Sequence, residues 1–104
     1  MVLYVMSWNI HPDKEKEYPK WAQSFIERSL EVPGVVEFRG YRTVSGRSQV
    51  VVTIEFADMN TFAAWQSNQD VQKITAEAFA MTLNLKVELW GPSPIVPEPI
   101  RPSK

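Results

Sequence analysis

Apolar residues recur at alternate positions along the first ten residues of the chain, which is typical of a β-strand. One face of this strand would carry Val2, Tyr4, Met6, Trp8 and Ile10, and the other Leu3, Val5, Ser7 and Asn9. Both faces are largely apolar, and such a strand must be covered on both sides. We therefore expect helices on one face of the sheet and a second sheet, such as that of a partner subunit, on the other.

Helical spacing of apolar residues follows after a short turn. The residues that share the predicted apolar face are Tyr18, Trp21, Ala22, Phe25, Ile26, Ser29 and Leu30. Asp13 is the expected N-cap, but Pro19 would remove one backbone hydrogen bond from a helix that begins at Lys14. The helix is therefore expected either to kink at the proline or to begin near Tyr18. It should end at 31–34, where a proline and a glycine follow each other.

Two segments rich in β-branched and aromatic residues, 35–44 and 49–56, flank a polar loop at 45–48 that contains a glycine. This arrangement predicts an antiparallel hairpin. Gly40 interrupts the first segment, which predicts a β-bulge there. The residues that share one apolar face of the second segment are Val50, Val52, Ile54 and Phe56.

Helical spacing then returns, with one polar break at 67–69. Asp58 is the expected N-cap of the first helical piece, and Asp70 that of its continuation. The apolar residues of the two pieces are Phe62, Ala63, Trp65, Val71, Ile74, Ala78, Phe79 and Met81. Residues 83–90 alternate again and predict a final strand whose single apolar face is formed by Leu83, Leu85, Val87 and Leu89.

The order strand, helix, hairpin, helix, strand predicts one α+β domain over residues 1–90, with ferredoxin-like βαββαβ topology and an antiparallel sheet. Residues 91–104 differ, because five of the eight prolines fall there. Such a segment forms an extended arm, and its Ile95, Val96 and Ile100 favour packing on its own domain or on a neighbour over disorder. A chain of 104 residues buries only about two thirds of its surface on folding, which also favours an oligomer.

The charge balance narrows the possible partners. The net charge is -1 and the 11 Lys and Arg residues are spread along the chain, so a nucleic-acid partner is not expected. No apolar run approaches the roughly 18 to 20 residues of a membrane span, and the opening at 1–6 lacks the flank and cleavage site of a signal peptide. With no cysteine there is no disulfide framework. We expect an unprocessed cytoplasmic protein that does not bind membranes.

RNA recognition motifs share the βαββαβ order, and residues 3–8 faintly resemble their first aromatic motif. In that family a longer aromatic motif lies on the third strand, whereas residues 49–56 offer almost no stacking surface. Metal and triad chemistry also lack support, because one histidine and scattered carboxylates give no ligand or nucleophile spacing. No glycine-rich loop opens a helix, so phosphate binding is not indicated.

Several local segments, taken in order and spacing, resemble the antibiotic biosynthesis monooxygenase family. They are 2–9 entering His11-Pro12-Asp13-Lys14, then Glu31-Val32-Pro33-Gly34, then Glu55-Phe56-Ala57-Asp58 leading to Phe62-Ala63-Ala64-Trp65. The resemblance extends over about residues 2–90. It implies a homodimer in which two ferredoxin-like subunits place their sheets face to face as a dimeric α+β barrel. It also implies a small-molecule pocket between each sheet and its helices.

Some members of that family oxidise aromatic polyketides with molecular oxygen and no cofactor, and relatives degrade haem. Haem degraders have an Asn at the end of the first strand, a Trp on the helix after the third strand, and a His further on. Asn9 and Trp65 match the first two, but residues 71–77 contain no histidine and the only one is His11. Haem degradation is therefore not expected, because haem iron needs an axial donor.

The leading hypothesis is a cofactor-independent monooxygenase-like protein acting on a small aromatic or quinone-type molecule, without a metal. Asn9 and Trp65 are the candidate catalytic residues, since an amide and an indole N–H can donate to a developing oxyanion. Trp21, Phe25 and His11 are the candidate substrate-binding residues. No residue is evident as the base.

Two alternatives stay open. The first is a non-enzymatic small-molecule-binding or regulatory protein that uses the same pocket, and the second is a structural dimer whose pocket is filled by its own side chains. Each candidate residue has a structural alternative as well. Trp65 can anchor its helix in the core, Asn9 can bond the turn after the strand, and His11 can be an exposed imidazole.

Overall fold

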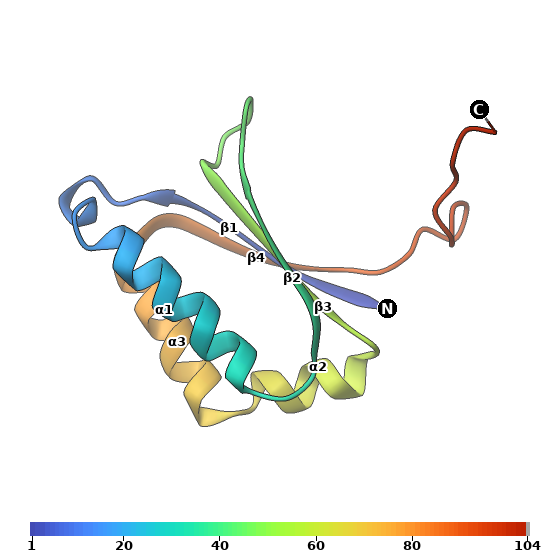
Figure 1. Cartoon of the computed structure of the whole chain (residues 1–104), viewed down its shortest axis with the longest axis horizontal. Helices are drawn as coiled ribbons and strands as arrows, with labels where there is room; N and C mark the ends of the chain where they lie inside the picture. Colours follow the sequence, from blue (N-terminus) through green and yellow to red (C-terminus); the bar gives the residue numbers. More distant parts are fainter. Residues whose placement is uncertain (104) are drawn as a thin grey trace.

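A four-stranded antiparallel sheet carries all of the helices on one face in the computed structural model, which describes residues 1–103 (Figure 1). The elements are β1 (Val2–Ile10), the 3-10 helix η1 (Pro12–Lys14), α1 (Tyr18–Glu31), β2 (Val35–Arg42), β3 (Val50–Phe56), α2 (Met59–Gln66), α3 (Gln69–Met81) and β4 (Thr82–Trp90). The strand order is β2-β3-β1-β4. The predicted α+β class and βαββαβ topology are confirmed, with the second helix divided into α2 and α3.

The alternation along β1 and β3 decides which side chains face the helices. The cross-strand pairs on this face are Val2 with Phe56, Tyr4 with Ile54, Met6 with Val52 and Trp8 with Val50. The helices add Trp21, Phe25, Phe62, Trp65, Val71, Ile74 and Ala78. Apart from Val2, all of these are at most 9% exposed and form one core. Burial of each large apolar side chain stabilises the fold by about 1.5–3 kcal/mol.

The aromatic residues of this core form two groups. Under α2, the rings of Phe56 and Trp65 lie 5.1 Å apart. Under α1, Trp21 stacks on Phe25 at 5.3 Å, and Trp8 meets both of these rings edge-on. Aromatic pairs of this kind add about 0.5–1.5 kcal/mol beyond the area that they bury.

The start of α1 matches one of the two predicted alternatives. The helix begins at Tyr18, with Pro19 in its first turn, where the missing N–H of a proline has no helical partner to lose. The prediction of Asp13 as N-cap is wrong. His11 caps the short η1 instead, and its Nδ1 accepts a hydrogen bond from the backbone N–H of Asp13 at 3.1 Å. A residue before proline prefers the extended conformation that an N-cap needs, which favours this position.

Of the N-caps predicted for the other two helices, one is confirmed and one is wrong. Asp58 caps α2, because its Oδ1 accepts from the backbone N–H of Thr61 at 2.8 Å, and this bond lowers the pKa of the Asp58 carboxyl. Asp70 does not cap α3; Asn68 does, by accepting from the N–H of Asp70 at 2.8 Å. Within residues 1–103, none of the helices combines the length and hydropathy that a membrane crossing needs.

The predicted bulge at Gly40 is wrong, because this glycine pairs with Val52 in regular register. The irregularity of β2 lies near its start, between Val35 and Glu37. Gly40 instead leaves open space above the strand, because it has no side chain.

The single apolar face predicted for β4 is also wrong. The pairing with β1 shifts between Ser7 and Asn9, and Asn84 adopts a left-handed conformation with φ of 56° at this shift. Asparagine tolerates that conformation better than most residues. As a result Leu83, opposite Asn9, lies on the same face of the sheet as Lys86, opposite Ser7.

The other face of the sheet, called the open face here, has no helix over it (Figure 1). The residues on it are Leu3, Val5, Ser7, Asn9, Glu37, Arg39, Tyr41, Val51, Thr53, Glu55, Leu83, Lys86, Glu88 and Trp90. The pattern that is apolar on both faces thus holds for part of β1, whereas β2 and β3 place mainly polar side chains here. A hollow of about 510 Å³ lies on this face between Leu3, Tyr41 and Trp90.

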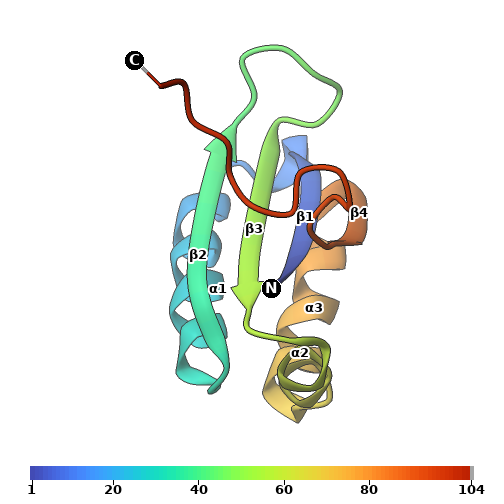
Figure 2. The same ribbon diagram turned by 90° about the vertical axis from the view of Figure 1, so that its right-hand side faces the viewer.

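Residues 91–103 form the proline-rich arm, which leaves the end of β4 and extends from the domain (Figure 1). Figure 2, which looks onto the open face, shows the arm in front of the strands. All of its residues are exposed, Ile95 to 89% and Ile100 to 78%. The arm therefore does not pack on its own domain, and packing on a neighbour stays a prediction. Residue 104, which was assigned to the arm, lies outside the described residues.

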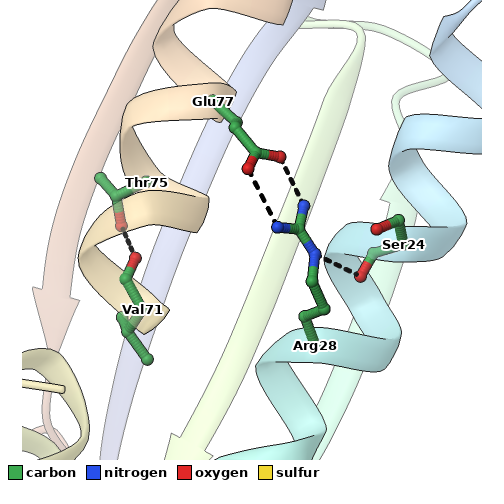
Figure 3. Close-up of polar contacts among 5 residues, drawn as sticks. All are labelled: Ser24, Arg28, Val71, Thr75 and Glu77. Carbon is green, nitrogen blue, oxygen red and sulfur yellow. Dashed lines mark hydrogen bonds and ion pairs between the residues drawn. The ribbon is translucent and has the colours of Figure 1, made fainter. Parts of the chain in front are cut away.

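A bidentate ion pair joins α1 to α3 on the outer surface of the helical layer (Figure 3). Both terminal nitrogens of Arg28 donate to the Glu77 carboxylate, one of them at 2.9 Å, and Arg28 Nε donates to the carbonyl of Ser24 at 3.4 Å. The hydrogen bond from Arg28 holds the pKa of the Glu77 carboxyl below its usual range. The two side chains are 34% and 43% exposed, so solvent screening limits the pair to about 0.5–1 kcal/mol.

Glu77→Gln is expected to lower the free energy of unfolding by about 0.5–1 kcal/mol near pH 7 and by less near pH 3. A carboxyl with a lowered folded-state pKa contributes its stability above the unfolded pKa and loses it as pH falls through the folded pKa. Urea unfolding of both proteins at the two pH values measures this. Glu15→Gln is the control, because Glu15 forms no ion pair within residues 1–103. An equal loss at both pH values would contradict the assignment.

Candidate functional site

A pocket of about 270 Å³ lies between α1 and the strands beneath it, at the β2 edge of the sheet. Its wall is formed by Tyr18, Ala22 and Ile26, which are four residues apart and so share one face of the helix. The other residues that line it are Trp8, Phe38, Gly40, Tyr41, Arg42, Val50 and Val52. This space is called the α1 pocket below. It occupies the position between sheet and helices that the family resemblance implied.

The strand register arranges the floor of the α1 pocket in rows that cross the sheet, because paired residues share a face. The rows are Trp8, Val50 and Arg42 at one end, Met6, Val52 and Gly40 in the middle, and Tyr4, Ile54 and Phe38 at the other end. The first row contains the cation and the second the glycine. The pocket is therefore polar at one end and apolar at the other.

Gly40 creates the space in the middle row. A Cβ atom placed on Gly40 would meet nothing within 4 Å, so any side chain at this position would project into an empty region. Its neighbours on the same face, Phe38 and Arg42, line the pocket on either side. The glycine thus opens the pocket without departing from regular strand pairing.

Two polar groups lie at the polar end of the α1 pocket. The indole Nε1 of Trp8 donates to the hydroxyl oxygen of Tyr18 at 3.0 Å, which fixes this hydroxyl and leaves its own proton for another acceptor. Arg42 lines the same end, and among residues 1–103 no carboxylate lies within ion-pair distance of its guanidinium. The pocket therefore offers one O–H donor and one permanent positive charge in aromatic surroundings.

Trp65, a predicted catalytic residue, lies in the core under α2 and is 4% exposed. Its indole Nε1 donates to the backbone carbonyl of Ser29 at 3.2 Å. That carbonyl belongs to the last turn of α1, where carbonyls lack helical partners, and the residue four positions on is Pro33, which has no N–H. The indole N–H is thus bound to the end of α1, and Trp65 does not line the α1 pocket.

Asn9, the other predicted catalytic residue, lies at the end of β1. Its Oδ1 accepts from the backbone N–H of Gln49 at 2.9 Å, while Gln49 Oε1 accepts from the N–H of Ile10 at 2.8 Å. These reciprocal amide bonds tie the loop between β2 and β3 to β1. Asn9 adjoins Trp8 in sequence but points to the opposite face of the sheet, away from the α1 pocket.

The three predicted substrate-binding residues take different places. Trp21 and Phe25 pack behind Trp8 in the core, and Trp21 also borders a shallow surface depression near Glu77. His11 is committed to the cap of η1. The structure therefore does not bring the five predicted residues together in one cavity. In residues 1–103, no group of three or more His, Cys, Asp and Glu side chains is gathered as metal ligands would be.

Sequence reasoning missed Tyr18, Gly40 and Arg42 as pocket residues. Gly40 and Tyr18 had been noticed, one as a break in a strand and the other as part of the apolar face of a helix. Arg42 gave no signal, because a cation near a strand end is common and only the register with Val50 shows which face it shares.

The βαββαβ fold and the aromatic pocket beside its first helix together define a small α+β domain of the ferredoxin-like class. The chain belongs to the antibiotic biosynthesis monooxygenase family, whose model matches residues 1–77. The matched segment contains every residue of the α1 pocket.

Solved structures share this fold at low sequence identity. The cofactor-independent oxygenase SnoaB from Streptomyces nogalater has a TM-score of 0.74 and 15% identity, over 93% of this chain and 97% of that one. A DABB-family protein with a ferredoxin-like fold from Mesorhizobium loti has a TM-score of 0.76 and 14% identity, over 88% of this chain and 96% of that one. A hydroxynitrile lyase from Passiflora edulis has a TM-score of 0.77 and 9% identity, over 86% of this chain and 90% of that one. No match was found among curated proteins.

Proposed function

We propose that the protein is a cofactor-independent, monooxygenase-like oxidoreductase that acts on a small aromatic or quinone-type molecule in the α1 pocket. The observation that carries this proposal is the pocket itself, with aromatic walls, the Tyr18 hydroxyl and the Arg42 guanidinium at one end. Membership of the family supports it. An oxygenase with the same fold that is described as cofactor-independent adds support at the level of the class.

The proposed oxidation requires few groups from the protein. The substrate carbanion or enolate reacts with O₂ to a hydroperoxide, which loses water, so that a CH₂ group and O₂ become a carbonyl and H₂O. The Tyr18 O–H and the Arg42 charge would stabilise the negative oxygen of the enolate beside the apolar and aromatic side chains that line the pocket. Asn9 and Trp65 would act behind this site as positioning residues, through the loop and the end of α1.

Oxygen consumption by the purified protein with one-ring and two-ring aromatic ketones that carry an acidic CH₂ group tests the proposal, with the carbonyl product identified by mass spectrometry. Tyr18→Phe is expected to lower kcat by about 100-fold to 1,000-fold, because it removes one donor to the developing charge. Thr75→Val, on α3 and outside the α1 pocket, is the control and should leave kcat unchanged. Absence of turnover together with a tightly bound ligand would favour the rival reading, a non-enzymatic binding or regulatory protein. That rival gains support because, in the described part of the chain (1–103), no carboxylate or imidazole lines the pocket.

We also propose that the protein is a homodimer in which the open face of one subunit lies against that of another. The hollow beside Leu3, Val51 and Trp90 offers apolar surface that a second sheet can cover. A stable dimer buries about 800 Å² per subunit, and the proline-rich arm adds exposed Ile95 and Ile100 to the available area. Such a dimer would be a dimeric α+β barrel, with one α1 pocket in each subunit.

Light scattering after size exclusion is expected to give twice the chain mass at low micromolar concentration. Deletion of residues 92–104 should weaken dimerisation by about tenfold or more, if the apolar residues of the arm contact the other subunit. Ile95→Ser with Ile100→Ser is the matched variant, since it keeps the length and the prolines of the arm. A monomer at all concentrations would contradict the dimer, and an unchanged dissociation constant in both variants would remove the arm from the interface.

A further inference from the structure

We infer that the α1 pocket takes an aromatic molecule of one or two rings that is already an anion when it binds, with Arg42 holding the charged oxygen. The inference rests on the proposed function only for the location of the ligand. It adds three properties of that ligand: its size, its charge and its direction in the pocket.

The size follows from the volume. The α1 pocket measures about 270 Å³, just below the range of about 300–1,000 Å³ that is usual for ligand sites. A cavity of about 150 Å³ is enough to hold one benzene ring. The pocket therefore encloses one ring or two fused rings, whereas part of a molecule with three or four fused rings would project into solvent.

The charge follows from the lack of a base. A neutral substrate must lose a proton before it reacts with oxygen, yet within residues 1–103 no carboxylate or imidazole lines the pocket, and His11 is bound in the cap of η1. Arg42 cannot serve as a base, because its guanidinium stays protonated. A ligand that is ionised in solution removes this difficulty, and the guanidinium then provides its counter-ion.

Arg42 is also available for a ligand, whereas two other arginines are already paired with carboxylates. Arg39 lies on the same strand but on the open face, and its guanidinium is paired with Glu37 at 2.6 Å. Arg28 is paired with Glu77. Within residues 1–103, Arg42 has no such partner, so a bound anion would be its first close opposite charge.

The direction follows from the rows of the floor. Arg42 and Trp8 lie at one end, where the Trp8 indole donates a hydrogen bond to the Tyr18 hydroxyl, and Phe38 lies at the other end. The anionic oxygen would therefore point to the first row, where it can accept from both Tyr18 and Arg42. The rings would lie above Gly40, between α1 and the strands, where a flat apolar body finds apolar contacts.

Calorimetric titration with a hydroxynaphthoquinone, ionised at neutral pH, and with its neutral methyl ether tests the inference. The protein is expected to bind the anion at least about tenfold more tightly than the ether. Arg42→Gln should abolish that preference, and Arg42→Lys should retain part of it. Arg47→Gln is the control, because it removes a charge from the loop after β2 without touching the α1 pocket, and it should leave the preference unchanged.

Equal affinity for the anion and the ether, or a preference that survives in Arg42→Gln, would overturn the inference. Tight binding of a three-ring hydroxyanthraquinone would overturn its size limit. The measurement does not need turnover, so its failure differs from failure of the proposed function. Preferential binding without oxygen consumption supports the ligand class and rejects the oxygenase, whereas turnover of neutral compounds that do not ionise supports the oxygenase and rejects the ligand class.

Discussion

Gly40→Leu is expected to close the α1 pocket and to weaken ligand binding by at least about 100-fold, while the domain stays folded. A side chain at this position meets no atom within 4 Å of its Cβ, so the four carbons of leucine would extend into the pocket between Phe38 and Arg42. The strand itself gains from the change, because glycine in a strand interior is less stable than other residues by about 0.5–1 kcal/mol. Loss of binding would thus come with equal or greater stability.

The measurement combines calorimetric titration with thermal unfolding. Gly91→Leu is the matched control, since a Cβ on Gly91 also meets nothing within 4 Å but lies outside the pocket. A graded series from alanine through valine to leucine at residue 40 should reduce affinity in the order of side-chain volume. Full affinity in Gly40→Leu would mean that the ligand does not bind beneath α1.

Trp65→Ala is expected to lower the free energy of unfolding by about 3–5 kcal/mol, which is a large part of the stability of a domain this size. The indole is 4% exposed and packs against Phe56 and Tyr4, with ring centroids 5.1 and 5.8 Å away. Trp65→Phe keeps most of this packing but leaves the Ser29 carbonyl without its donor. That variant should lose about 1–3 kcal/mol.

Urea unfolding measures both values, and Trp90→Phe is the control. Trp90 also donates its indole N–H, to Glu88 Oε1 at 3.0 Å, but it is 49% exposed, so its replacement should change stability by less than about 0.5 kcal/mol. Ligand affinity in folded Trp65→Phe separates the two roles considered for this residue. Unchanged affinity and turnover fit an anchor of α1, whereas loss of turnover with full stability would restore Trp65 as a catalytic residue.

The fold could be predicted from the sequence because its signals are short-range. Alternation along β1 and β3, and the helical spacing from Tyr18 to Leu30, are properties of neighbouring residues and need no knowledge of the rest of the chain. One error arose where two similar residues compete for one role, the N-cap of α3. Asp70 and Asn68 can both cap α3, and the local backbone selects Asn68. The register shift at Asn84, within β4, places Leu83 on the other face of the sheet, and the alternation of residues in the sequence does not reveal such a shift.

The candidate site was harder to predict, because a pocket depends on which residues meet across strands. Arg42 and Trp8 are 34 positions apart, and both pair with Val50, a fact that only the register of three strands provides. Trp65 and Asn9 attracted attention through their polar groups. In the fold these groups are bonded to backbone atoms of Ser29 and Gln49. Residue type alone suggested catalytic roles for Asn9 and Trp65, whereas in the fold their polar groups satisfy a backbone N–H and a backbone carbonyl.

The bond between Trp65 and the carbonyl of Ser29 has a consequence for the evolution of the family. Pro33 ends α1 and cannot donate to that carbonyl, so a donor from α2 is needed where this proline is present. A lineage that replaced the proline could extend the helix and satisfy the carbonyl internally, after which phenylalanine or leucine would suffice at the position of the tryptophan. The two positions are therefore expected to covary among homologous sequences, although they are 32 residues apart in the chain.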